Sequence, residues 1–177
     1  MKSVTIIGKG PSWKECPFGS QELWGPESCL ITEGLKDKKY TKVFGFDNND
    51  ITKECLLIAK ERGIPFVSTH PYATELYPLV DIVRRFQVSY LKNSISYMLA
   101  YAIYHGYESI RLDGVDQGPQ WEFQQSKSYI TFWLGVATGL RIEWRMGQGS
   151  LTWAYRIGQD SLPQAFQVKE GLIRVNE

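Results

Sequence analysis

The sequence predicts an α/β protein with a Rossmann-like, mainly parallel sheet, helices on both faces and a C-terminal β-hairpin. Along the first 150 residues, short apolar runs rich in β-branched residues alternate with stretches of helical periodicity. Parallel strands need crossover connections, and these are usually helical. The first run, Ser3–Ile7, ends in the glycine-rich stretch Gly8–Ser12, which is typical of a buried strand that enters a tight turn.

Length and charge limit the function classes. The chain has 177 residues, of which 43% are hydrophobic, and a domain of this size buries roughly 70% of its unfolded surface. We expect one unit, with residues 1–150 as a Rossmann-like domain and residues 151–177 as a hairpin extension of it. The net charge of +1 gives no general attraction to nucleic acid or to an anionic membrane. Without a long apolar stretch or a cleavage-site pattern, a cytoplasmic location is expected.

The cysteines do not indicate a metal centre or a disulfide framework. Cys16, Cys29 and Cys55 are odd in number and lack C-x-x-C spacing. His70 and His105 are the two histidines that could join them in a metal site. We therefore expect no bound metal and no cofactor.

The predicted elements follow from periodicity and from turn residues. Between Asn93 and His105 the apolar positions recur every three or four residues, and Gly106 follows as a stop signal. Residues 51–62 and 121–138 have the same helical pattern. The predicted strands after the first are Cys29–Thr32, Lys42–Phe46, Ile64–Val67, Ser109–Leu112 and Leu140–Trp144, and the predicted terminal hairpin pairs Ala165–Val168 with Leu172–Val175.

Ligands of an open parallel sheet bind at the carboxyl ends of its strands, near the point where the strand order reverses. Glycines in Gly8–Ser12 would let backbone amides approach a phosphate, and Pro11 suits the first position of a short helix whose N-terminus favours anions. Trp13 replaces the third glycine of G-x-G-x-x-G, which weakens a dinucleotide interpretation. A tight turn without a ligand is the alternative. The candidate nucleotide-binding residues at this edge are Gly8, Lys9, Gly10, Pro11, Ser12, Asn93, Ser94 and Asp116.

Each of the other polar candidates has two interpretations. Asn93 and Ser94 open a helix and would either cap it or contact a ligand. Asp116 would bind a ribose hydroxyl or cap the following helix. His70 follows a predicted strand on the same edge and is either a catalytic imidazole or a solvated one. Tryptophans near predicted loops are candidates for base stacking, and these are Trp13, Trp24 and Trp121. Tryptophans within apolar periodic segments are expected in the core, and these are Trp133 and Trp144.

Two segments resemble a known family. Val4–Ser12 resembles the G-N-G-P-S-L opening of the bacterial sialyltransferases of glycosyltransferase family 42, and 6-hydroxymethylpterin diphosphokinase-like domains have a similar opening. From Asn93 to Asp116 the chain is similar to the sialyltransferase segment T-S-G-x-Y-M-x-A-x-A-I-x-x-G-Y-x-x-I-x-L-x-G-I-D, with the same spacing. Small proteins of this type also occur in bacteriophage genomes, so the resemblance implies a small phage-encoded relative or a bacterial one.

The resemblance implies roles for individual residues and also raises a difficulty. Gly8, Lys9 and Gly10 would approach the nucleotide phosphate or ribose, Ser94 and its neighbours would contact the sugar-nucleotide, and Asp116 would lie at the nucleotide edge. The stretch 125–128 resembles the family's H-S-K-N, in which the histidine is the general base. Gln125 stands at that position and cannot accept a proton at neutral pH, so His70 would have to supply the base from another loop.

We therefore expect a protein that binds a nucleotide or a nucleotide-sugar and acts as a small glycosyltransferase-like transferase on an unknown acceptor. His70 and the position of Gln125 are the catalytic candidates, and a nucleotide-sugar would be the co-substrate. A catalytically silent nucleotide-binding or protein-interaction module is the alternative that Gln125 favours. A diphosphotransferase is a third, if Asp47, Asp50 and Asp116 gather around Mg²⁺. The sequence leaves an oligomer open.

Overall fold

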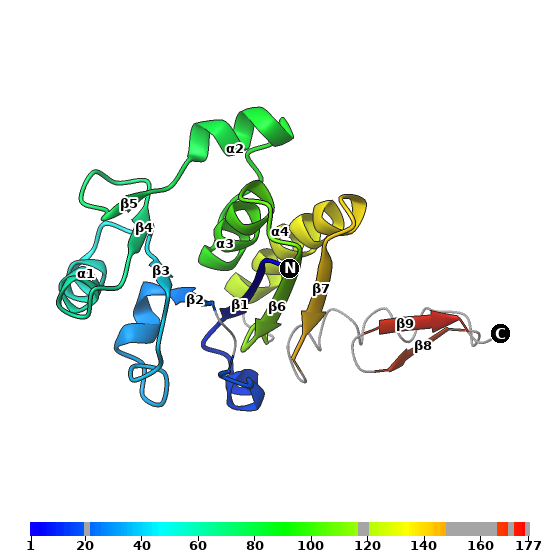
Figure 1. Ribbon diagram of the computed structural model, residues 1–177, viewed down its shortest axis with the longest axis horizontal. Coiled ribbons are helices and arrows are strands. Elements are labelled where there is room, and N and C mark those ends of the chain that lie inside the picture. The colour runs from blue at the N-terminus through cyan, green and yellow to red at the C-terminus, as the bar shows by residue number, and fades with distance from the viewer. Residues whose placement is uncertain (20–21, 117–120, 148–165, 170–171, 176–177) are drawn as a thin grey trace.

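The computed structural model describes residues 1–19, 22–116, 121–147, 166–169 and 172–175 (Figure 1). A seven-stranded sheet has the order β5-β4-β3-β2-β1-β6-β7, and all six neighbouring pairs are parallel. The predicted fold class is therefore confirmed. The strands are β1 (Ser3–Ile7), β2 (Leu23–Pro26), β3 (Lys42–Phe44), β4 (Phe66–Ser68), β5 (Glu75–Leu76), β6 (Ser109–Asp113) and β7 (Glu143–Met146).

The chain order places the reversal point of the sheet between β1 and β6. From β1 the chain builds outward through β2 to β5, then returns to pair β6 with the other side of β1 and ends at β7. Register pairs Ile7 with Asp113, so these two strands end at the same level. The loops that follow β1 and β6 consequently meet at the carboxyl edge of the sheet, where a ligand crevice is expected.

Helices cover both faces of the sheet. The helices are α1 (Asp50–Glu61), α2 (Leu79–Phe86), α3 (Ser94–Tyr104) and α4 (Trp121–Gly139), with short 3-10 helices η1 (Pro11–Glu15) and η2 (Glu27–Leu30). One core joins α2, α3 and α4 to the face that carries Ile6, and the other joins α1 and η2 to the face that carries Ile7. The alternation of neighbouring residues between faces is the period of two that defines a strand. None of the described helices is long and apolar enough to cross a membrane.

The helix starts follow from their caps. Asn49 caps α1 by accepting a hydrogen bond from the Thr52 amide through Oδ1 at 2.9 Å. Asn93 and Ser96 form a capping box on α3, in which the Ser96 amide donates to Asn93 Oδ1 at 2.7 Å. The capping interpretation of Asn93 is thus confirmed. The predicted helices 51–62, 93–105 and 121–138 match α1, α3 and α4 to within about two residues at each end, the usual uncertainty of helix boundaries.

One predicted strand is wrong. Residues 27–30 form the 3-10 helix η2, and the strand of this region is β2, which pairs with β1. Cys29 and Leu30 lie in η2, and their side chains pack against α1. This packing explains the apolar run that the sequence pattern assigned to a strand. Trp24 was expected near a loop as a stacking candidate, but it is fully buried in β2, with Tyr107 edge-on at 4.9 Å. Trp133 is fully buried, as expected of a core residue.

Part of the C-terminal prediction lies outside the described residues. Strands β8 (Phe166–Lys169) and β9 (Leu172–Val175) pair antiparallel as a separate two-stranded sheet. Residues 148–165 and 170–171 lie outside the described ranges, so the predicted hairpin and the division at residue 150 stay predictions.

Candidate functional site

The glycine loop after β1 is bound tightly to the loop after β6. The amide of Gly8 donates to the carbonyl of Asp113, and the amide of Gly10 donates to the carbonyl of Gly114, both at 2.8 Å. The Ser12 amide donates to Asp116 Oδ2 at 2.7 Å, and the Ser12 hydroxyl donates to Asp116 Oδ1. These amides are therefore used inside the protein. The loop also carries the exposed side chain of Lys9, a cation that an anion could meet.

The glycines allow the two loops to approach each other. A Cβ on Gly8 would overlap the carbonyl oxygen of Gly114, and a Cβ on Gly10 would lie 2.5 Å from Asp116 Oδ2. Gly114 has a φ of 67°, which favours glycine. The conformation of the loop thus requires glycine even without a ligand. Asp116 is half-buried, and its carboxylate accepts the hydrogen bonds from Ser12. A ribose contact by Asp116 stays a prediction.

The start of α3 lies at the same edge of the sheet, because the C-terminal end of α3 leads through a short turn to the amino end of β6. Asn93 Nδ2 donates to the carbonyl of Ser126 on α4 at 3.4 Å, and Ser94 is half-buried in the first turn. Gln125, the predicted catalytic position, accepts a hydrogen bond from Lys92 Nζ at 2.8 Å. An amide that accepts from an ammonium group has no basic function here, and it ties α4 to the segment before α3.

His70 follows β4 at this edge and is half-buried. Its Nε2 lies 3.1 Å from the carbonyl oxygen of Phe46, and its ring stacks on Tyr72 with the ring centroids 5.0 Å apart. A carbonyl oxygen only accepts hydrogen bonds, so in the neutral imidazole Nε2 carries the proton and Nδ1 carries the lone pair. The geometry therefore fits an imidazole that accepts a proton at Nδ1.

Aromatic packing connects His70 with the start of α3. The ring of Phe46, whose carbonyl contacts His70, stacks on Tyr97 in the first turns of α3 at 4.0 Å between centroids. Tyr77 lies edge-on to both rings and donates from Oη to the carbonyl of Tyr97 at 3.0 Å. The structure thus forms two groups at the carboxyl edge: the glycine loop with Asp116, and His70 with the start of α3.

Glu27 is a buried acid at the same edge that the sequence analysis did not identify. It follows the last residue of β2, its side chain is 7% exposed, and Thr52 Oγ1 donates to its Oε1 at 3.4 Å. Burial raises the pKa of Glu27, and the negative charge of Asp47 raises it further, while Lys9 opposes the shift. The acid therefore lies between the loops that follow β1 and β3. Its place roughly 20 residues after the glycine loop was the sequence signal that could have identified it.

The three acids of the diphosphotransferase hypothesis are not brought together. Asp47 and Asp50 follow β3, whereas Asp116 follows β6, and β2 and β1 lie between those strands. Three interstrand steps of about 4.8 Å give roughly 14 Å, far beyond the span of one Mg²⁺ site. In the part of the chain that the structure describes, no group of three metal-ligating side chains is present.

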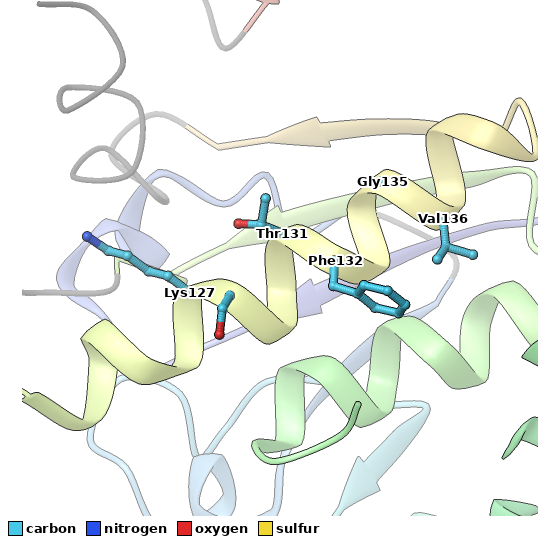
Figure 2. Close-up of a pocket in the computed structure, with 6 residues that line it drawn as sticks. Lys127, Thr131, Phe132, Gly135 and Val136 are labelled. Carbon is cyan, nitrogen blue, oxygen red and sulfur yellow. The ribbon is translucent and has the colours of Figure 1, made fainter. Parts of the chain in front are cut away.

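A shallow groove of about 830 Å³ runs along α4 (Figure 2). Its described lining includes none of the predicted nucleotide-binding residues, although Lys127 and Ser128 belong to the stretch that begins with Gln125. Figure 2 shows Lys127 extending along α4 away from Phe132. The described lining of the groove lies on α4 and shares no residue with the two groups at the carboxyl edge.

Comparison with known proteins shows a shared fold. No protein-family model matches this chain, and no curated protein sequence matches it. Structures of the sialyltransferase CstII from Campylobacter jejuni do match. One in complex with the substrate analogue cytidine-5'-monophosphate has a TM-score of 0.60 at 19% identity, and one with CMP-3FNeuAc has 0.62 at 18%; each match covers 88% of this chain and 84% of that one. A third, with a trisaccharide acceptor and CMP, has a TM-score of 0.57 at 16% identity and covers 87% and 84%. The chain therefore shares the α/β fold of a sialyltransferase.

Proposed function

We propose that the protein binds a nucleotide-sugar at the carboxyl edge of its sheet and transfers the sugar to an acceptor hydroxyl. The observation that carries the proposal is the reversal of strand order between β1 and β6, with the Gly8–Ser12 loop at that point. The fold shared with CstII, whose structures hold CMP, CMP-3FNeuAc and an acceptor trisaccharide, supports the same ligand class.

Two side chains have properties that suit the transfer. Lys9 is an exposed cation on the loop after β1, where it would meet the donor phosphate. His70 Nδ1 would accept the proton of the acceptor hydroxyl as the acceptor oxygen attacks the anomeric carbon. The bond between that carbon and the phosphate oxygen then breaks, and the phosphate leaves with the electron pair. Asn93 and Ser94 are proposed to contact the donor from the start of α3.

Binding and turnover are to be measured separately. Nucleotides and nucleotide-sugars, CMP and CMP-sugars among them, are screened by thermal shift, since a ligand at 100 times its Kd adds about 2.7 kcal/mol to stability. Donor consumption is then followed with a pool of acceptors. His70→Ala should lower turnover by roughly 10² to 10⁴ and leave affinity nearly unchanged. His105→Ala is the matched control, because His105 lies at the other end of α3. Turnover that survives His70→Ala removes this residue from the mechanism.

A second candidate function is a nucleotide-binding module without catalysis. Gln125 favours it, because its amide is held by Lys92 at the position of the family base. In this case the donor binds but is not consumed, and neither His70→Ala nor Gln125→His changes that result.

A further inference from the structure

We propose that Glu27 binds the ribose hydroxyls of the nucleotide and so makes the protein selective for ribonucleotides over 2′-deoxyribonucleotides. This inference rests on the proposed nucleotide site and names a determinant of its selectivity.

Glu27 stands close to the glycine loop at the carboxyl edge of the sheet. It follows β2, the neighbour of β1 on the side away from β6, and thus stands one strand from the glycine loop. When a phosphate lies at the loop after the first strand of such a sheet, the ribose extends along the carboxyl edge toward the next strand. An acid at the end of that strand is then within reach of the ribose, whereas Asp116 is on the opposite side of β1 and is engaged by Ser12.

The carboxylate of Glu27 has few described hydrogen-bond donors around it. Its described partners are its own backbone amide and the hydroxyl of Thr52, whose oxygen is 3.4 Å away and also lies 3.1 Å from Asn49 Oδ1. An ionised carboxylate accepts about four hydrogen bonds. Within the described residues the carboxylate therefore accepts fewer hydrogen bonds than it is able to accept. Two adjacent hydroxyl groups of a ligand would supply the missing donors.

The surroundings of Glu27 disfavour its negative charge. A Cβ on Gly45 would lie 2.5 Å from Cζ of Phe66 and 3.2 Å from Glu27 Cδ, so the acid packs closely against the turn that follows β3. Burial disfavours the charged form of Glu27, which raises its pKa, and no ion pair compensates for this cost in the described residues. A glutamine would fill the same space without that cost. An acid kept at the expense of stability, at the edge where ligands bind, is more consistent with a binding role than with a structural one.

The test compares affinities for ribose and deoxyribose forms. Calorimetry measures the Kd of each ribonucleoside 5′-monophosphate and its 2′-deoxy counterpart. The wild type should bind the ribose form of its preferred base at least about tenfold more tightly, as expected when a hydrogen bond to a charged group is lost. Glu27→Gln should reduce this ratio and Glu27→Met should bring it to about 1, since methionine has no strong acceptor. The melting temperature of Glu27→Gln should stay equal to that of the wild type or rise.

A matched control uses the acid at the other end of the same strand. Glu22 accepts hydrogen bonds from Trp24 Nε1 at 3.0 Å and from Tyr107 Oη at 2.7 Å, so Glu22→Gln should lower stability and leave the affinity ratio unchanged. Equal wild-type affinities for both sugar forms, or a ratio that survives Glu27→Met, would overturn the role of Glu27 while the nucleotide site stands. If none of the ribonucleotides binds to the wild type, the proposed function fails and this inference fails with it.

Discussion

Gly10→Ala tests whether the glycine loop owes its composition to the contact with Asp116. Gly10 has a φ of −65° and a ψ of 150°, a conformation that any residue adopts, so alanine meets no backbone strain. Its Cβ would instead lie 2.5 Å from Oδ2, 2.7 Å from Cγ and 2.8 Å from Cβ of Asp116. All three distances are below van der Waals contact, and Asp116 cannot retreat without losing its hydrogen bonds to Ser12. Overpacking of this kind costs about 1 to 3 kcal/mol.

A double-mutant cycle isolates the cause of that loss. Gly10→Ala, Asp116→Gly and the double variant are unfolded in urea, and the free energy of unfolding is compared with that of the wild type. Asp116→Gly removes the carboxylate and also the acceptor of the Ser12 bonds, so it destabilises by itself. The double variant should lose less than the sum of the two single losses, by at least about 1 kcal/mol. A stable Gly10→Ala, or additive losses, would refute the steric argument. The same contact predicts that Gly10→Val is destabilising as well.

Three further predictions concern ionisable groups. Folding raises the pKa of Glu27 above 4.5, so the stability that its protonated form contributes is complete below about pH 4.5 and is lost as the pH rises through the folded pKa. In urea unfolding, the gain in free energy of unfolding from Glu27→Gln should therefore grow from pH 4 to pH 8. A gain that shrinks over this range would contradict the prediction. Burial alone would raise the pKa of Glu75, but hydrogen bonds from Lys42 and Tyr101 outweigh burial and lower the pKa. Glu75→Gln should therefore reduce the free energy of unfolding by about 1 kcal/mol at pH 7. The reduction should become smaller as the pH falls below about 4.5, where the carboxylate becomes protonated. Burial raises the pKa of the Cys16, Cys29 and Cys55 thiols to about 12, about 12 and about 11, respectively. A thiol reagent at pH 8 should therefore modify the unfolded chain and not the folded one. Rapid labelling of the native protein would show that the thiols are not buried.

Local signals in the sequence predict the best-defined parts of the fold. α3 is identified by its apolar periodicity and by the asparagine and serine that cap it, and β1 by its β-branched residues and the following glycines. β2 could not be found this way. It is four residues long, and Gly25 and Pro26 are both unfavourable in strands. Its conformation depends on pairing with β1, in which Thr5 opposes Leu23, and that contact is not local. The same applies to β5, which has only two residues.

The candidate site was predictable to a similar extent. Gly8–Ser12 and Asp116 each follow a strand, and this common position predicts that they meet, as Ser12 and Asp116 do. The sequence could not show that the loop amides are used within the protein, because that depends on the register between β1 and β6. Glu27 was missed because it precedes a run that resembles a strand, and its burial follows from the packing of η2 on α1.

Hydrogen–deuterium exchange with and without a saturating nucleotide-sugar shows where the ligand binds on the sheet without assuming any catalytic residue. CMP and a CMP-sugar serve as first probes. We expect slower exchange in peptides from the carboxyl edge, which cover residues 8–12, 45–49, 68–72 and 92–97. Peptides from the opposite edge, around Lys2 and Glu108, should exchange unchanged. Slower exchange confined to that opposite edge or to the α4 groove, with the carboxyl-edge peptides unaffected by a ligand that binds, would show that the nucleotide site is not at the carboxyl edge.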